Sequence, residues 1–207
     1  LADSVYEGNE IVNITLSNAT KVTISDSTAT LTITDDETAP TVTMNFNNCS
    51  SNTAISTTVA ESDGSNCITA FLSGATDENV TVSVSLSGTA SSSDYSTDYL
   101  SSGDVTINAG NTQASYSFDP TADSINEQNE TLIVNISSVS GGSATESGTQ
   151  VLNFTINDAN TDPKITLTAA TSSVAENSGS ITVKATSSIV TYQDVTVGIS
   201  TSASGTG

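Results

Sequence analysis

Apolar and polar residues alternate in short runs along the whole chain. In residues 11–16, for example, polar Asn13 and Thr15 separate the apolar residues, which is the pattern of a half-buried β-strand. No stretch has the period of an amphipathic helix. About seven strands in about 120 residues are typical of a β-sandwich, so we predict an all-β protein. The further predicted strands are residues 29–33, 41–46, 68–72, 80–86, 105–107, 114–118, 132–136 and 152–156.

The pattern repeats itself along the chain. Residues 2–10 (ADSVYEGNE) return as residues 122–130 (ADSINEQNE), and residues 80–84 (VTVSV) return as residues 195–199 (VTVGI). A period near 120 residues indicates domains joined in series, because solenoid repeats are shorter. We therefore expect a segment of a longer polypeptide that consists of tandem antiparallel β-sandwiches. The predicted units are the C-terminal half of a first repeat (1–38), a complete repeat (39–161) and the N-terminal half of a third (162–207).

The charge of the chain is strongly one-sided. Twenty-three acidic residues stand against three lysines, with no arginine and no histidine, which gives a formal net charge of −20. Lys21, Lys164 and Lys184 are too few to displace counterions from phosphates, so no nucleic-acid partner is expected. Histidine-based catalysis is excluded, and no apolar run is long enough to span a membrane. High charge with low hydrophobicity is common in disordered chains, but the alternating β-branched residues favour an ordered protein.

The acidic residues gather at the ends of the predicted strands. A sandwich brings alternate strand ends to the same pole, so carboxylates distant in sequence are expected to converge there. Two carboxylates about 4 Å apart repel by about 4 kcal/mol at an effective dielectric constant of about 20. A hard divalent cation removes this repulsion, and ligation by oxygen alone points to Ca²⁺. The alternative is a solvated acidic rim, but acids recur at matching positions in two repeats, and this favours the cation site.

Several short motifs resemble those of one known family. They are Asp94-Tyr95, the turn at 109–111, the acidic loop 123–130 and the closing segment 156–159 (INDA), with a closer version of the closing segment at 33–37 (ITDDE). Together they are similar to the Calx-beta domain family, the calcium-binding, immunoglobulin-like sandwiches of sodium–calcium exchangers and many large surface proteins. The resemblance extends over nearly the whole chain.

This resemblance implies a set of calcium ligands. In the complete unit the implied ligands are Glu61, Asp94, Asp123, Glu127, Glu130 and Asp158. In the first half-unit they are Asp3, Glu7, Glu10, Asp35 and Asp36, and in the third they are reduced to Glu176. Asn157 and Ala159 replace acids of the family pattern, so we expect one or two weakly held ions in the complete unit and a fuller site in the first.

The two cysteines, Cys49 and Cys67, both lie in the complete unit. They occur in stretches that are expected beside the same pole of the sandwich, so we predict a disulfide between them, with two free thiols as the alternative. Metal binding by the two cysteines is not expected, because the chain has no histidine and no further cysteine to complete such a site. A disulfide implies an oxidising, extracytoplasmic compartment.

These features predict a structural role. We expect a calcium-stiffened spacer or filament component of a secreted or cell-surface protein, with Ca²⁺ as its cofactor and neighbouring repeats as its partners. Self-association into fibres is a further expectation. The alternative is an adhesin that holds a glycan or a protein through bridging calcium, but aromatic residues are only 4% of the chain. An enzyme is not expected, although Glu7 and Glu10 have the residue types of a glycosidase pair.

Overall fold

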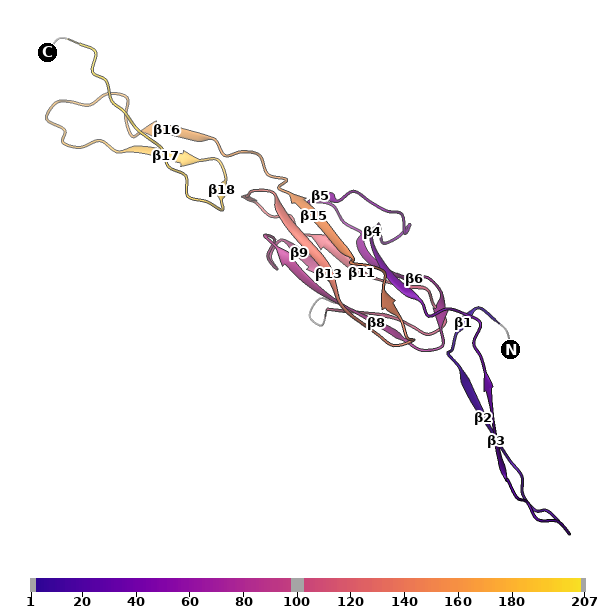
Figure 1. The fold of residues 1–207 in the computed structure, drawn as a ribbon. Coiled ribbons are helices and arrows are strands. Elements are labelled where there is room, and N and C mark those ends of the chain that lie inside the picture. Colours follow the sequence, from indigo (N-terminus) through magenta and orange to yellow (C-terminus); the bar gives the residue numbers. More distant parts are fainter. Residues whose placement is uncertain (1–2, 98–102, 206–207) are drawn as a thin grey trace.

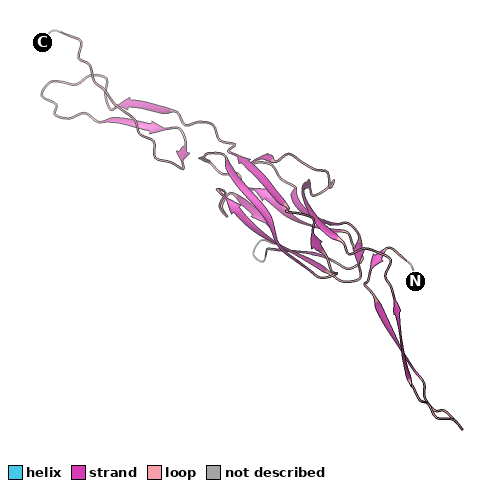
Figure 2. Ribbon diagram, viewed as in Figure 1, coloured by secondary structure: helices cyan, strands magenta, loops and turns pink. Residues whose placement is uncertain are grey.

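The computed structural model of the chain describes residues 3–97 and 103–205. Strands are the only regular elements in these residues, as Figure 2 shows, which confirms the predicted all-β fold. They form three parts in a row: an N-terminal segment (3–38), a β-sandwich (39–161) and a C-terminal segment (162–205) (Figure 1). The ends of the predicted first and third units, 1–2 and 206–207, lie outside the described residues. No described residue belongs to a helix of membrane-spanning length and hydrophobicity.

The sandwich consists of two five-stranded sheets. One sheet has the strand order β10-β8-β13-β15-β5, and the other has the order β14-β4-β6-β11-β9. The first sheet contains β5 (Thr58–Ala60), β8 (Val80–Gly88), β10 (Asp104–Ile107), β13 (Glu130–Ser140) and β15 (Val151–Asn157). The second contains β4 (Thr41–Asn48), β6 (Asn66–Leu72), β9 (Tyr95–Thr97), β11 (Gln113–Pro120) and β14 (Thr145–Glu146).

Two edges of the sandwich depart from the predicted antiparallel pairing. The strand β5 pairs parallel with β15, and β14 pairs parallel with β4. Each of these short strands lies in the connection between two strands of the opposite sheet, so the chain changes sheets there and covers an open edge. The remaining neighbours within the two sheets are antiparallel.

The core lies between the two sheets and follows the alternation of the sequence. In β8, for example, Val80 and Val82 are fully buried, whereas Thr81 between them is half-buried. Three phenylalanines, one from each of β4, β11 and β15, meet in the centre. The ring centroids of Phe46 and Phe154 are 3.9 Å apart, and those of Phe118 and Phe154 are 5.8 Å apart. A small number of aromatic rings thus closes a core that consists mainly of valine, isoleucine and leucine.

The predicted disulfide is present between Cys49 and Cys67, with the two Cα atoms 5.0 Å apart. It joins the loop after β4 to the start of β6, next to a hydrogen bond that the Cys49 N–H donates to the Ser65 carbonyl at 2.9 Å. Cys67 is buried and Cys49 is exposed. The bridge therefore anchors a surface loop to a core strand.

Reduction of this disulfide is expected to lower the free energy of unfolding of the sandwich by about 3 kcal/mol. The physical reason is the greater chain entropy of the unfolded state once the loop between the two cysteines is open. Urea unfolding with and without dithiothreitol measures the effect. The double variant Cys49→Ser/Cys67→Ser is the control, because it should have the lower stability and no response to the reductant. Equal stability of the oxidised and reduced chains would contradict the prediction.

The N-terminal segment is a β-hairpin. It contains β1 (Val5–Tyr6), β2 (Glu10–Thr15) and β3 (Thr28–Ile33), of which β2 and β3 pair antiparallel. The strand expected at 11–16 is confirmed as β2, but its predicted burial is wrong, because Ile11 is 66% exposed and Ile14 is 50% exposed. Within the described residues, β2 pairs with β3 and no second sheet packs against them. The alternating sequence gives β2 an apolar face, but no other sheet among the described residues covers that face.

The C-terminal segment contains β16 (Ile165–Ala169), β17 (Val183–Ser187) and β18 (Val190–Thr191). Residues 195–199, which repeat part of β8, form no strand. In the sandwich, β8 lies between β10 and β13 and is hydrogen-bonded to both. The described part of the C-terminal segment has no strands equivalent to β10 and β13. The backbone of residues 195–199 therefore has no neighbouring strand with which to form hydrogen bonds.

Candidate metal centre

Three carboxylates, one from the loop before β9 and two from the acidic loop that leads into β13, meet at one pole of the sandwich. Asp94 stands directly before β9, Glu127 directly follows β12 (Ile125–Asn126), and Glu130 begins β13. One carboxylate oxygen from each lies within 4.8 Å of one from each of the others. The carboxyl groups of Asp94 and Glu130 are also hydrogen-bonded to each other.

The other three ligands implied for the complete unit surround this trio. Glu61, which follows β5, is 6% exposed, and its Oε2 accepts the Ala159 N–H at 3.5 Å. Asp158 follows β15 and Asp123 opens the acidic loop. Burial is the largest cause that raises the pKa of Glu61 and of Glu127, and the charges of Asp158 and Asp123 add to it. The structure therefore places all six at one end of the sandwich, which we call the acidic pole: Glu61, Asp94, Asp123, Glu127, Glu130 and Asp158.

Asp158 fixes the backbone of the acidic loop. Its Oδ2 accepts hydrogen bonds from the Glu127 N–H and the Asn126 side-chain amide, both at 2.9 Å. Its Oδ1 accepts the Asn160 N–H at 2.7 Å, and its own N–H donates to Asn129 Oδ1 at 3.4 Å. Asp158 thus orients Glu127 through the main chain, in addition to bringing its own charge.

The N-terminal segment builds the same frame with equivalent residues. Oδ2 of Asp35 accepts the N–H groups of Glu7 and Gly8 at 2.9 and 2.7 Å, and its Oδ1 accepts the Glu37 N–H at 3.2 Å. The Asp35 N–H donates to Asn9 Oδ1 at 3.1 Å. One hydrogen-bonded frame therefore closes two acidic loops 120 residues apart, which argues against a merely solvated rim.

The electrostatics of the acidic pole show that its carboxyl groups repel one another. Burial, the hydrogen bond to Asp94 and the neighbouring negative charges raise the pKa of Glu130 to about 7. Burial also raises the pKa of Glu61, and only the Ala159 N–H opposes this. Burial acts in the same direction on Asp94, but hydrogen bonds from Ser91, Glu130 and Ser93 bring the pKa of Asp94 below its usual value. Near neutral pH, Glu130 is therefore partly protonated, and its protonated carboxyl group donates a hydrogen bond to the Asp94 carboxylate.

The donors at this pole fit a calcium ion. Calcium binds oxygen at about 2.3–2.6 Å, so ligand oxygens on opposite sides of one ion lie about 4.6–5.2 Å apart, which accommodates the 4.8 Å spread of Asp94, Glu127 and Glu130. These three residues would hold the ion, with buried Glu61 as a further oxygen donor. A bound cation would replace the shared proton and neutralise the repulsion.

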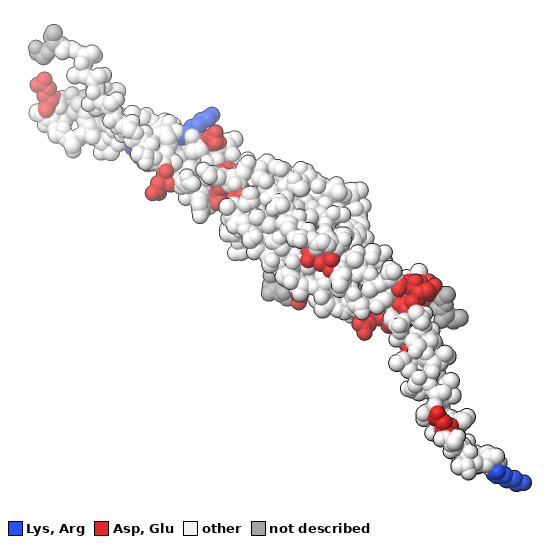
Figure 3. All heavy atoms as spheres, viewed as in Figure 1, with Lys and Arg blue, Asp and Glu red and all other residues white. Residues whose placement is uncertain are grey.

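A second acidic cluster lies in the N-terminal segment, where Figure 3 shows acidic side chains gathered at the junction with the sandwich. Its carboxylate oxygens, within 4.8 Å of one another, come from Asp35, Asp36 and Glu37. Glu37 was not among the predicted ligands. The negative charge of the predicted ligand Asp3 is the largest of the effects that raise the pKa of Glu7. The charges of Glu10, another predicted ligand, and of Asp77 in the sandwich add to it.

The implied ligand of the third unit, Glu176, stands apart from both clusters. It lies exposed in the loop between β16 and β17. Within the described residues it belongs to no group of converging carboxylates.

Sequence reasoning missed the asparagines that complete the frames. Asn9 and Asn129 accept the N–H of the closing aspartates, and the Asn160 side chain donates to the Ile125 carbonyl at 2.9 Å. The signal was present for the first two, because Asn-Glu recurs at the same place in both acidic loops. Asn160 has no such signal, since Glu37 occupies the equivalent place in the first frame.

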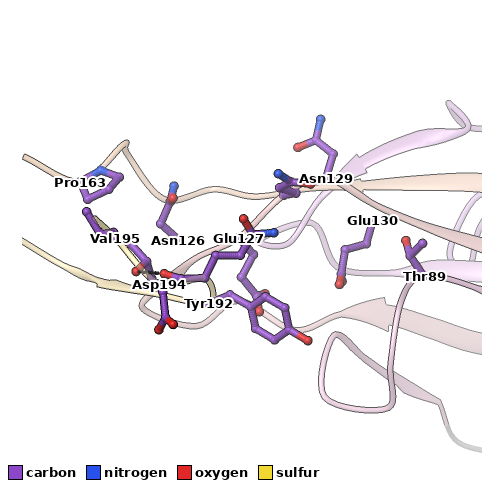
Figure 4. A pocket seen from close by; sticks show the side chains of 12 residues that line it. Thr89, Asn126, Glu127, Asn129, Glu130, Pro163, Tyr192, Asp194 and Val195 are labelled. Carbon is purple, nitrogen blue, oxygen red and sulfur yellow. Dashed lines mark hydrogen bonds between the residues drawn. The ribbon is translucent and has the colours of Figure 1, made fainter. Parts of the chain in front are cut away.

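An open groove of about 460 Å³ separates the acidic pole from the C-terminal segment. Glu127 and Glu130 line it on the side of the sandwich, and Tyr192 and Asp194 line it on the other side (Figure 4). Tyr192 is 76% exposed. The groove is therefore polar, with one accessible aromatic ring beside the carboxylates.

The protein has two packed sheets, and carboxylates at the ends of several strands converge at one pole. These are the features of a cation-binding β-sandwich module. The sequence profile of the Calx-beta domain matches residues 1–37 and 51–160. The chain therefore belongs to the Calx-beta domain family, a family of calcium-binding β-sandwich modules. Among solved structures, the apo form of the Calx CBD1 domain is similar, with 17% identity, a TM-score of 0.43, and coverage of 58% of this chain and 98% of that chain. A comparison with curated proteins finds no match.

Proposed function

We propose that this chain is a calcium-stiffened spacer in a secreted or cell-surface protein. The observation that carries the proposal is the position of the two hydrogen-bonded acidic frames. Each frame holds a loop whose short strand, β1 or β12, pairs with the following part of the chain. An ion bound to such a loop would order it where two units meet, so calcium would act on the stiffness of the joint.

The proposed location is supported by the disulfide and by the chemistry of the site. Disulfides persist in oxidising compartments, and the Cys49–Cys67 bridge is formed. Extracellular calcium modules have dissociation constants of about 10⁻⁴–10⁻³ M, which suits a site with few carboxylates and open to solvent. Neighbouring repeats are the proposed partners, and assembly of such strings into fibres is a further part of the proposal.

Calcium is expected to bind the chelator-treated chain in this affinity range and to make it more extended. Isothermal titration calorimetry measures the binding, and small-angle X-ray scattering in chelator and in calcium measures the maximum dimension. Glu130→Gln should weaken binding, because it removes one of the three converging carboxylates. Asp104→Asn is the matched control, since Asp104 lies in β10 outside the acidic pole. Absence of binding at about ten times these concentrations, or equal dimensions in both conditions, would refute the proposal.

The groove beside the acidic pole favours one alternative, an adhesin that holds a glycan or protein through calcium. Tyr192 provides the exposed aromatic ring that such a site needs, next to Glu127 and Glu130. Calcium-dependent binding to a glycan array that is kept in Tyr192→Phe and lost in Tyr192→Ala would support the adhesin. Binding that is absent in calcium would leave the spacer as the function.

A further inference from the structure

Two small parallel sheets connect the three parts of the chain. At one end of the sandwich β1 pairs with β7 (Ala75–Thr76), and at the other end β12 pairs with β18. Figure 1 places β1 and β18 at opposite ends of the sandwich. In both cases the first strand belongs to an acidic loop and the second strand belongs to the part that follows it in sequence. Both joints therefore pair the acidic loop of one part with a strand of the next part along the chain.

The two joints also use the same register and the same hydrogen bond. The paired residues are Val5 with Ala75 and Tyr6 with Thr76 at the first joint, and Ile125 with Val190 and Asn126 with Thr191 at the second. Directly after each pair, the Asp77 N–H donates to the Tyr6 carbonyl at 3.2 Å, and the Tyr192 N–H donates to the Asn126 carbonyl at 3.1 Å. These positions are related by the sequence offsets of 120 and 115 residues that define the repeat.

The receiving strands are shaped by a recurring Ser-x-x-Thr segment, residues 73–76 and 188–191. The serine hydroxyl, in Ser73 and in Ser188, accepts a backbone N–H from the first strand of its own unit at 2.9 Å. The threonine hydroxyl donates to the carbonyl two residues later, at 2.6 Å for Thr76 and 2.7 Å for Thr191. Each receiving strand is thus held by its own unit, and its other edge pairs with the short strand of the preceding part, β1 or β12.

The inserted strands are held in an equally regular way. The carboxylate of Asp3 accepts the Val5 N–H at 2.8 Å, and that of Asp123 accepts the Ile125 N–H at 2.7 Å. The closing aspartate of each frame then binds the N–H of the residue after the strand, Glu7 or Glu127. Each two-residue strand is therefore held at both ends by hydrogen bonds within its own part of the chain.

We propose that the Ser-x-x-Thr segments are docking edges, each of which receives the two-residue strand of the acidic loop of the preceding repeat through its main chain. The side chains at the joint support recognition by the main chain, because they differ between the two cases while the hydrogen bonds do not. Tyr6 is replaced by Asn126, and Asp77 is replaced by Tyr192. Addition of a strand to an exposed edge is a general mode of recognition in which backbone hydrogen bonds supply the contact.

The docking edge extends the proposed spacer role: its main-chain hydrogen bonds form without calcium, and an ion bound to the acidic loop would add to the stiffness of the joint that they make. The partner of each edge is an acidic loop with an Asp-Ser-x-x strand from another repeat of this kind. Repeats with these two features would join in one register, whatever their other loops contain.

Amide hydrogen exchange measured by NMR on the full chain tests the proposal. The N–H groups of Asp77 and Tyr192 are expected to exchange about tenfold or more slowly than in an unstructured peptide, in chelator as well as in calcium. Tyr192→Pro removes the donor of the second joint, whereas Tyr192→Ala keeps it. We expect the proline variant to free the C-terminal segment, seen as residual dipolar couplings that no longer fit one alignment with the sandwich. The alanine variant should keep the wild-type couplings.

Two results would overturn the docking edge. One is exchange of the Tyr192 and Asp77 amides at the rate of an unstructured peptide in both conditions. The other is a Tyr192→Pro chain that keeps a single alignment. The Ser188 amide donates to the Lys164 carbonyl at 2.9 Å, so slow exchange of this amide in the variant would show that the C-terminal segment stays folded. Failure of calcium binding has a separate signature, because calorimetry reports it without affecting these amides.

Discussion

Replacing Asp158 by asparagine is expected to weaken calcium binding at the acidic pole by about 10- to 100-fold, the usual effect of losing a group that orients metal ligands. Both oxygens of Asp158 accept hydrogen bonds, from Glu127 and Asn126 on one side and from Asn160 on the other. Asparagine keeps the size but places an NH₂ group where one of these acceptors stands. The acidic loop would lose its frame, and Glu127 would no longer be held toward Asp94 and Glu130.

Calorimetric titration of Asp158→Asn beside the wild-type chain measures this effect. Asp104→Asn removes the same charge at a distance from the pole, so it separates the loss of the frame from the loss of net charge. Circular dichroism of both variants checks that the sandwich is folded. An Asp158→Asn affinity within about twofold of the Asp104→Asn affinity would show that the frame does not orient the ligands.

Replacing Phe154 by alanine is expected to lower the free energy of unfolding of the sandwich by about 3–5 kcal/mol. Phe154 is 2% exposed and its ring contacts those of Phe46 and Phe118, so truncation leaves a cavity between the two sheets. Because the chain has few other large side chains, the surrounding core can fill this space only in part. Urea unfolding, followed by the near-ultraviolet circular dichroism of tyrosine, measures the change.

The matched control for this prediction is Val151→Ala. Val151 lies in the same strand, β15, but is 41% exposed, so its truncation should change stability by no more than about 0.5 kcal/mol. A loss of less than about 1 kcal/mol for Phe154→Ala would mean that the three rings do not form the centre of the core.

The strands of the sandwich could be predicted because burial in a two-sheet core repeats with a period of two residues. The edge strands β5, β9 and β14 were missed, because they are too short to show the alternation; β5, for example, buries one valine, Val59, between Thr58 and Ala60. The burial of residues 11–16 was predicted wrongly for a different reason. Alternation reports which face of a strand is apolar, but the second sheet that would cover this face is not among the described residues.

The acidic residues of the site could be found from their recurrence, but their separate tasks could not. The sequence implies Asp35 and Asp158 as ligands, and in the structure their oxygens have the additional task of accepting backbone N–H groups of the acidic loops. Backbone donors have no signature in a sequence, so the partner of such a carboxylate is visible only in three dimensions. The same limit hid Glu37, which gathers with Asp35 and Asp36 because the chain turns there.

The matching registers of the two joints have a geometric consequence for a longer string. Units that add head to tail with one fixed contact are related by a constant rotation and a constant translation, which together define a screw axis. A string of such repeats would therefore wind as a superhelix with a regular pitch, and its grooves beside the acidic poles would follow the same spiral. The joint would then determine the directions in which successive grooves face, and hence how many of them a flat surface could engage at once.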